Sequence, residues 1–341
     1  MDIRTAIAEL IARRDLPEEG VEAVVRAIME GEASEAQIAG FLVALRMKGE
    51  RVEEIVGAAR AMRQHATPVP VARTVVDTCG TGGDMRHTFN ISTAAALVAA
   101  AAGAGVAKHG NRAVSSSSGS ADVLEALGFN LELAPETIAR SIDELGFGFL
   151  FAPTHHPAMR HAAPIRRELA ARTVFNVLGP LTNPAGARAQ VVGVYAPELV
   201  PTIAEVLARL GADRAFVVHG AGGVDELSPA GPNLVCEVVH GEVRQREIDP
   251  LELGIDRCSP DELRGGEPEE NAETIRQIFA GADGGKRDAV LLNAAGAIAA
   301  GGLARDLGEG VSIARESIES GAAGQRLEAL IEFSKTAEVA A

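Results

Sequence analysis

Apolar residues recur at helical spacing along the first part of the chain. Ile3, Ile7 and Leu10 lie three or four residues apart, and the same spacing returns after residue 20, which is the pattern of amphipathic helices. Ser34 and a Gln three residues later form a capping box that begins a further helix. The pattern stops at the Pro-bearing stretch 67–70. The first 66 residues are therefore predicted to be entirely helical.

The pattern changes after residue 70 to short β-branched runs that alternate with helical ones. Strands are expected at residues 74–77, from 106 onward, and at 147–152, 191–195 and 215–219, with helices at 94–102, 121–127, 135–145 and 200–210. Residues 234–249 have the pattern of a β-hairpin with its turn at His240-Gly241. This alternation predicts an α/β fold with a central, mainly parallel sheet covered on both faces. We expect a small all-helical domain over residues 1–70 and a larger α/β domain over residues 71–341.

Charge narrows the classes of function. The chain of 341 residues has a formal net charge of −15, which argues against non-specific nucleic-acid binding because such binding needs a basic face. An anionic substrate would need a site with its own local positive charge or with recruited metal ions.

Cysteine usage and the first residues bear on the compartment. The three cysteines, Cys79, Cys236 and Cys258, are far apart and form no CxxC pair, which favours a reducing environment. The first residues contain no apolar signal core. The Ala-rich run 94–104 is too short and too weakly apolar to cross a bilayer. We expect a cytoplasmic protein without a membrane segment.

The first segment suited to chemistry is the Gly-rich run from Gly80 to Asp84, which follows a predicted strand and precedes a helix that begins with Ser and Thr. Glycine backbone N–H groups and a helix N-terminus are suited to binding phosphate. The segment is neither a dinucleotide fingerprint, because Met85 occupies the third glycine position, nor a P-loop. An ordinary turn between strand and helix is the alternative interpretation.

A second such segment follows the next strand, from Lys108 through Arg112 to Ser120. Lys108 and Arg112 are candidates for the missing positive charge, and Ser120 is predicted to cap the following helix. A solvated Ser-rich loop is the alternative. Two anion-suited loops at successive strand ends favour a ligand site, because the carboxyl ends of strands are where α/β sheets bind ligands.

The third segment, residues 155–184, is unusually basic for so acidic a chain. Arg166 and Arg167 are adjacent, so they cannot share one face of a helix. An inward-facing Arg166 would suit a planar carboxylate through bidentate pairing, whereas Arg167 is interpreted as a surface residue.

The fourth segment is the pair Asp225-Glu226 in a Gly-rich loop after a predicted strand. Adjacent carboxylates are usually solvated surface groups. Beside two phosphate-suited loops they instead favour Mg²⁺, which is commonly held by few carboxylates together with substrate phosphates.

Taken together and in this order, the four segments resemble those of anthranilate phosphoribosyltransferases over nearly the whole chain. The runs 80–84, 108–112 and 172–184 carry the resemblance, together with the late segment 263–272. It implies a fold of the nucleoside phosphorylase/phosphoribosyltransferase type, a homodimer joined through the helical domain, and helices from about 160–185 that pack on that domain. It also implies transfer of a ribose 5-phosphate unit from phosphoribosyl pyrophosphate (PRPP) to anthranilate, the second step of tryptophan biosynthesis from chorismate.

The resemblance also implies roles for individual residues. PRPP is expected to contact Gly80, Gly83, Asp84, Thr88, Asn90, Ile91, Ser92, Thr93, Lys108, His109, Gly110, Asn111, Arg112, Ala113, Val114, Ser115, Ser116 and Ser120. Anthranilate is expected to contact Gly80, Asn111, His156, Arg166, Gly179 and Pro180. Two Mg²⁺ ions are expected on Ser92, Asp225 and Glu226. His109 is a weak candidate for a proton acceptor, and a structural role for it is equally open.

The chain departs from the family pattern at a few positions, among them Met85, Arg86 and Ser117, which bears on PRPP affinity and loop geometry. Two other functions stay open. A pyrimidine nucleoside phosphorylase would bind phosphate and a nucleoside without needing the Asp225-Glu226 pair. A non-catalytic, nucleic-acid-binding relative would need a basic groove, which the net charge of −15 disfavours.

Overall fold

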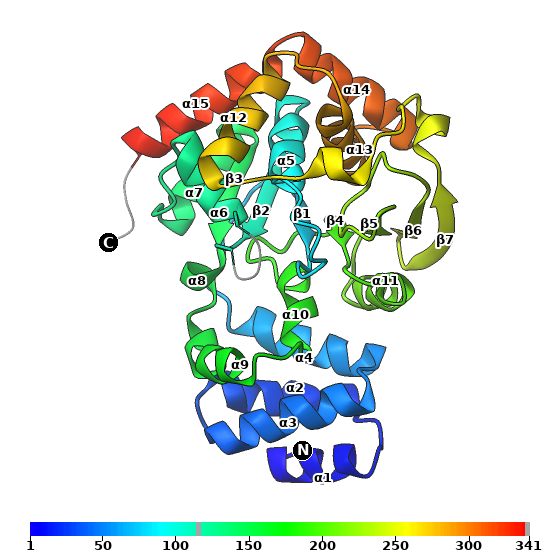
Figure 1. Cartoon of the computed structure of the whole chain (residues 1–341). Coiled ribbons are helices and arrows are strands. Elements are labelled where there is room, and N and C mark those ends of the chain that lie inside the picture. The colour runs from blue at the N-terminus through cyan, green and yellow to red at the C-terminus, as the bar shows by residue number, and fades with distance from the viewer. Residues whose placement is uncertain (114–116, 338–341) are drawn as a thin grey trace.

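A computed structural model describes residues 1–113 and 117–337 of the chain. Four helices, α1 (Ile3–Ile11), α2 (Glu18–Met29), α3 (Glu35–Lys48) and α4 (Val52–Gln64), form the helical domain at one end of the molecule (Figure 1). The predicted capping box begins α3, with Ser34 Oγ accepting from Gln37 N–H at 3.3 Å and Gln37 Oε1 from Ser34 N–H at 2.9 Å. The buried carboxylate of Glu54 accepts from Leu16 N–H and Lys48 Nζ, each at 2.9 Å, which compensates its burial.

The larger domain is built on a seven-stranded sheet with the order β3-β2-β1-β4-β5-β6-β7. Its strands are β1 (Val76–Gly80), β2 (Val106–Gly110), β3 (Phe147–Phe151), β4 (Ala189–Gly193), β5 (Arg214–His219), β6 (Asn233–Val239) and β7 (Glu242–Ile248). Strands β1 to β5 pair in parallel, and β6 and β7 add an antiparallel hairpin. The chain winds outward from β1 to β3 and then returns to place β4 on the other side of β1. The carboxyl ends of β1 and β4 are therefore a topological switch point, where α/β sheets form ligand crevices.

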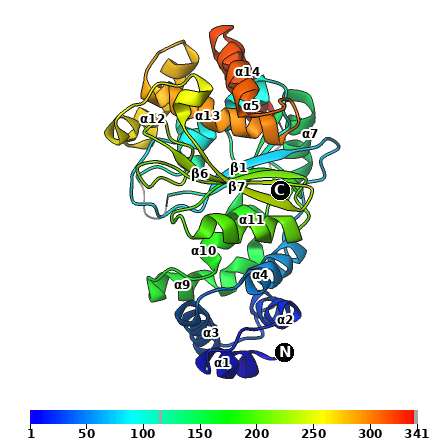
Figure 2. The ribbon, with the colours of Figure 1, turned by 90° about the vertical axis from the view of Figure 1, so that its right-hand side faces the viewer.

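Helices cover both faces of this sheet (Figures 1 and 2). One face carries α5 (Ile91–Ala101), α6 (Ser120–Leu127), α12 (Pro268–Phe279), α13 (Gly285–Ala300), α14 (Leu307–Glu319) and α15 (Ala322–Thr336), joined in one apolar core. Helix α7 (Pro135–Leu145) packs on β3. The other face carries α11 (Leu199–Arg209), whose apolar cluster continues into the helical domain.

Short helices lie between the helical domain and the sheet. They are α8 (Ala152–His155), α9 (Ala163–Leu169) and α10 (Phe175–Leu178). Ile165, Phe175 and Leu178 belong to the same buried apolar cluster as the side chains of α2 to α4. The chain segment around α9 and α10 therefore packs against the helical domain, although the two are distant in sequence (Figure 1).

The fold class predicted from the sequence is confirmed, with differences at element ends. The hairpin turn at His240-Gly241 is present, with both residues at positive φ. The prediction for the start of α6 is wrong: Gly119 occupies the N-cap position and Ser120 is the first helical residue. Its hydroxyl bonds instead to the backbone N–H and C=O of Asn111, both at 3.2 Å. Within residues 1–113 and 117–337, every helix is too short or too polar to span a membrane.

Candidate active site

A cavity of about 720 Å³ opens at the carboxyl ends of β1 and β2, between the sheet and the segment around α9 and α10. Every candidate site residue that the structure describes lines it. These are Gly80, Gly83, Asp84, Thr88, Asn90, Ile91, Ser92, Thr93, Lys108, His109, Gly110, Asn111, Arg112, Ala113, Ser120, His156, Arg166, Gly179, Pro180, Asp225 and Glu226. The candidates Val114, Ser115 and Ser116 lie outside the described residues.

The Gly-rich loop of residues 80–87, called the donor loop below, leaves β1 in an unusual backbone conformation. Gly82 and Gly83 have φ of +68° and +78°, which glycine adopts without steric cost. Gly82 N–H donates to Asp225 Oδ2 at 2.6 Å, and Asp225 N–H donates to Asp84 Oδ2 at 3.3 Å. The donor loop and the loop that carries Asp225 therefore hold each other at the switch point.

The two loops approach so closely that glycine is required at their contact. A Cβ on Gly80 would lie 2.4 Å from Asp225 Oδ2, and a Cβ on Gly193 would lie 1.5 Å from the Asp225 carbonyl oxygen. Residues 80 and 193 are paired neighbours on β1 and β4. Glycine at this pair of positions therefore leaves room for both the carboxylate and the backbone of Asp225.

The side chain of Asp225 is buried and that of its neighbour Glu226 is half-buried, and the pKa values of both carboxyl groups are raised. Burial and the neighbouring charge of Asp225 together raise the pKa of Glu226 to about 8, against the opposing effect of Lys108. Burial and then the charge of Asp84 raise the pKa of Asp225. Such groups resist ionisation until a cation compensates them. With Ser92 Oγ they form a set of hard oxygen donors that fits Mg²⁺.

Lys108 supplies a positive charge beside this acidic cluster, because it lowers the pKa of Glu226. Its side chain is 2% exposed, and Nζ donates to the Thr78 carbonyl at 2.6 Å and to Ser92 Oγ at 3.2 Å. The carboxylate of Asp77, whose pKa is raised by burial and lowered less by the charge of Lys108, accepts from Asn183 Nδ2 at 2.8 Å and from His109 N–H at 3.1 Å. The buried ammonium therefore holds the hydroxyl of Ser92, a residue whose backbone N–H donates to Glu226 Oε1 at 3.2 Å.

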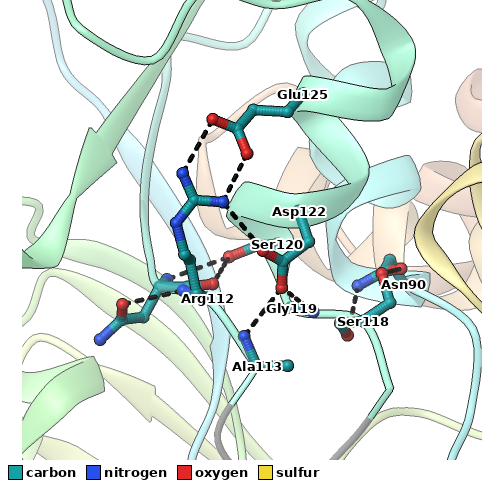
Figure 3. Close-up of polar contacts among 9 residues, drawn as sticks. Asn90, Arg112, Ala113, Ser118, Gly119, Ser120, Asp122 and Glu125 are labelled. Atoms are coloured by element: carbon teal, nitrogen blue, oxygen red, sulfur yellow. Dashed lines mark hydrogen bonds and ion pairs between the residues drawn. The ribbon is translucent and has the colours of Figure 1, made fainter.

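The second anion-suited loop is braced by carboxylates of α6 (Figure 3). Asp122 accepts from the backbone N–H groups of Ala113 and Gly119, both at 2.9 Å. The Arg112 guanidinium bonds Asp122 at 3.0 Å and forms a bidentate pair with Glu125. Arg112 was expected to supply free positive charge to the cavity. In this structure its charge is already paired, and in Figure 3 its side chain extends along α6 toward Glu125.

Two buried histidines, His109 and His156, also line the cavity. The rings of His109 and His156 lie 5.0 Å apart between centroids. Burial lowers the pKa of His109 to about 3 and that of His156 to about 4. His109 Nδ1–H donates to the Gly179 carbonyl at 3.1 Å, so its Nε2 is a hydrogen-bond acceptor. Neither Nε2 has a partner among the described residues.

The adjacent residues Arg166 and Arg167 of α9 point in different directions, as neighbouring positions on a helix must. Arg166 lines the cavity and lies over the Phe175 ring, with 5.3 Å from Cζ to the ring centroid, whereas Arg167 is exposed. Desolvation lowers the pKa of Arg166. It remains a cation at neutral pH, because guanidinium does not lose its proton in proteins. A cavity lined by this partly buried cation and by the neutral imidazole acceptor of His109 is suited to a planar molecule with a carboxylate and an N–H donor.

Comparison with known proteins agrees with this geometry. The model of the glycosyl transferase family, helical bundle domain, matches residues 4–66, and that of the glycosyl transferase family, a/b domain, matches residues 72–324. The anthranilate phosphoribosyltransferases of Pelotomaculum thermopropionicum and Chloroflexus aggregans are each 54% identical to the chain. The alignments cover 97% and 98% of the chain and 96% and 99% of those proteins. The chain belongs to the anthranilate phosphoribosyltransferase family.

Solved structures of the family superpose over nearly the whole chain. Anthranilate phosphoribosyltransferase from Thermus thermophilus matches with a TM-score of 0.92 at 51% identity, covering 97% of this chain and 99% of that one. The enzyme from Saccharomyces cerevisiae in complex with PRPP and Mg matches with a TM-score of 0.89 at 29% identity, covering 98% of each chain. Family membership favours a phosphoribosyltransferase over the phosphorylase and over a nucleic-acid-binding protein.

Sequence reasoning missed several residues that line the cavity. They include Met62, Phe89, Met159, Phe175, Asn176 and Thr182. Met62, Met159 and Phe175 are apolar residues on helical segments, where the sequence pattern predicts core packing and offers no sign of a ligand. Only the tertiary packing of α4 and of the segment around α9 and α10 brings these three side chains to the cavity wall.

Proposed function

We propose that the chain transfers the 5-phosphoribosyl group from PRPP to anthranilate, giving N-(5-phosphoribosyl)anthranilate and pyrophosphate, in tryptophan biosynthesis. The observation that carries the proposal is one cavity that joins hard oxygen donors at the switch point to a desolvated arginine on the opposite wall. The complex of the Saccharomyces cerevisiae relative with PRPP and Mg supports it.

On the donor side, the donor loop and the segment from Lys108 to Ser120 would hold PRPP through backbone N–H groups and hydroxyls. Ser92, Asp225 and Glu226 would hold two Mg²⁺ ions. Bound Mg²⁺ would neutralise the charge that develops on pyrophosphate as it leaves. Because Arg112 is paired with Asp122 and Glu125, it would contribute to PRPP binding mainly by stabilising the loop that follows β2, rather than by providing an unpaired charge.

On the acceptor side, Arg166 would pair with the anthranilate carboxylate. The contact set proposed here is Gly80, Asn111, His156, Gly179 and Pro180, with His109 beside it. Because the pKa of His109 is lowered to about 3, its Nε2 would accept a hydrogen bond from the amine. The bond would orient the amine, and the ring would not become protonated. Anthranilate's amine is neutral at pH 7, so positioning and electrostatics would supply most of the rate.

We further propose a homodimer joined through the helical domain, in the cytoplasm. Ile11 at the end of α1 and Met47 on α3 are 71% and 65% exposed, and Val43 lies one turn before Met47. Exposed apolar side chains on one domain favour an interface. Residues 1–70 and 71–341 would be the two domains, with α9 and α10 packing on the first. The three cysteines are free thiols, as a reducing compartment requires.

The decisive experiment follows anthranilate fluorescence with PRPP and Mg²⁺. The chain has no Trp and one Tyr, so its own background is low. The signal is expected to fall only when enzyme, PRPP and Mg²⁺ are all present, and Asp225→Asn is expected to abolish the fall. An unchanged signal at high enzyme concentration would overturn the proposal, and phosphorolysis of thymidine or uridine would favour the phosphorylase instead.

A second measurement separates the two halves of the cavity. Arg166→Ala is expected to raise the KM for anthranilate much more than the KM for PRPP, because the guanidinium would contact only the acceptor. Arg167→Ala is the matched control, since Arg167 is the exposed neighbour on the same helix. Equal effects of Arg166→Ala on both KM values would remove Arg166 from the acceptor site.

A further inference from the structure

One arginine outside every contact set proposed above connects the two sides of the cavity. Arg172 lies between α9 and α10, on the segment that also carries Arg166. Its Nη2 donates to the carbonyl of Gly83 in the donor loop. The guanidinium also lies over the Tyr195 ring, with Cζ 4.0 Å from the ring centroid. An exposed arginine thus makes two directed contacts, both with residues beside the switch point.

The partners of Arg172 are themselves tied to the donor loop. Tyr195 N–H donates to Thr81 Oγ1 at 3.1 Å, and Thr81 N–H donates to the Gly193 carbonyl at 2.9 Å. On its other side the loop is held by the bond from Gly82 to Asp225. The donor loop is therefore clamped between the carboxylate contact and the Arg172–Tyr195 pair.

The bond to Gly83 fixes the direction of the next peptide group. In a trans peptide the C=O and the following N–H point in opposite directions. Holding the Gly83 carbonyl toward Arg172 therefore turns the Asp84 N–H away from the guanidinium. This N–H has no acceptor among the described residues, and Asp84 lines the cavity. Gly83 has a φ of +78°, and a glycine peptide without a bond partner would be free to reorient.

We propose that Arg172 is a positioning residue for the donor: it holds the Gly83–Asp84 peptide so that the Asp84 N–H is presented to an oxyanion of PRPP. Arg172 itself does not touch the substrate. The inference rests on the proposed function for the identity of the anion, whereas the clamp on the donor loop is a property of the chain alone. A lysine at this position would retain a donor for the carbonyl but would lose the planar stacking on Tyr195.

Tyr195 gives this proposal a direct reporter, because it is the only Tyr of a chain without Trp. Binding of PRPP with Mg²⁺ is titrated through Tyr195 emission and, as a check, by calorimetry, with Arg172→Ala, Arg172→Lys and the control Arg167→Ala. Arg172→Ala is expected to weaken PRPP binding about tenfold, as expected for loss of a charge-assisted hydrogen bond. It is also expected to increase acrylamide quenching of Tyr195. Arg172→Lys is expected to recover part of the affinity, and Arg167→Ala to match the wild type.

The kinetic signature separates positioning from general damage. The KM for PRPP is expected to rise about tenfold in Arg172→Ala, while the KM for anthranilate stays within about twofold of the wild type. Wild-type PRPP affinity in Arg172→Ala, or equal increases in both KM values, would overturn the proposal. If the wild-type chain did not consume anthranilate at all, the proposed function would fail, while the PRPP titration would still decide the role of Arg172.

Discussion

Replacing Gly193 by Ala offers the sharpest test of where the divalent cations bind. The substitution displaces the loop that carries Asp225 and Glu226 without removing either carboxylate. Gly193 lies at the end of β4, paired with Gly80 and facing the backbone of Asp225. A Cβ at residue 193 would lie 1.5 Å from the Asp225 carbonyl oxygen and 2.3 Å from its carbonyl carbon. Both atoms belong to backbone, so no side-chain rotation relieves the clash.

The size of the displacement follows from these distances. Ordinary contact begins at 3.4 Å, so the Asp225 backbone in Gly193→Ala must retreat by about 2 Å. A misplacement of about 1 Å at a reacting centre can cost about 100-fold in rate. We therefore expect kcat/KM to fall by at least about 100-fold and the half-saturating Mg²⁺ concentration to rise. The overpacking is expected to cost about 1–3 kcal/mol of stability.

The assay is anthranilate consumption against Mg²⁺ concentration at saturating PRPP, with urea unfolding run in parallel. Gly40→Ala on α3 is the matched control. Among the residues that the structure describes, the new Cβ would meet only Ile7 Cδ1 outside its own helix, at 3.5 Å. Alanine stabilises a helix over glycine by about 0.5–1 kcal/mol. A folded Gly193→Ala protein with wild-type Mg²⁺ dependence would refute the placement of the metal ions on Asp225 and Glu226.

Four further outcomes follow from the structure. The pKa values of His109 (about 3) and His156 (about 4) are lowered, so both rings stay neutral above pH 5. At saturating Mg²⁺, the plot of kcat/KM against pH is therefore expected to show no transition near pH 6.5. A transition there that His109→Gln removes would contradict this expectation. Because both histidines bind protons less readily in the folded state, the stability that they contribute above pH 6.5 is lost as the pH falls toward 4. In His156→Gln, the melting temperature is expected to fall less over this pH range than in the wild type. Asp122→Ala is expected to raise the KM for PRPP more than Glu125→Ala, because Asp122 accepts two backbone N–H groups as well as Arg112; equal effects would show that only the ion pairs matter. Asn293→Ala is expected to lower the free energy of unfolding by about 2–4 kcal/mol in urea, since the buried amide bonds both N–H and C=O of Leu227; a loss below about 1 kcal/mol would mean that the loop after Glu226 is held by other contacts.

The sequence by itself determined the elements and the loops that carry chemistry. Helical spacing, the capping box at Ser34 and the β-branched runs are local signals, and the strands and helices they predict are present with shifts of a few residues at their ends. The polar and Gly-rich loops were found for the same reason, since turn and phosphate-suited residues act over a few positions. Parallel strands then bring their carboxyl ends to one edge, and all described candidate residues do line one cavity.

Only the tertiary structure decided the state of those residues. Arg112 is paired with Glu125, His109 is kept neutral by burial, and Arg172 reaches Gly83 across 89 positions of the chain. Each of these depends on which groups meet across elements distant in sequence, and on how completely water is excluded there. Local patterns carry no information on either. The elements and the candidate site residues were therefore predictable from the sequence, whereas the charges, partners and directions of the side chains depended on tertiary packing.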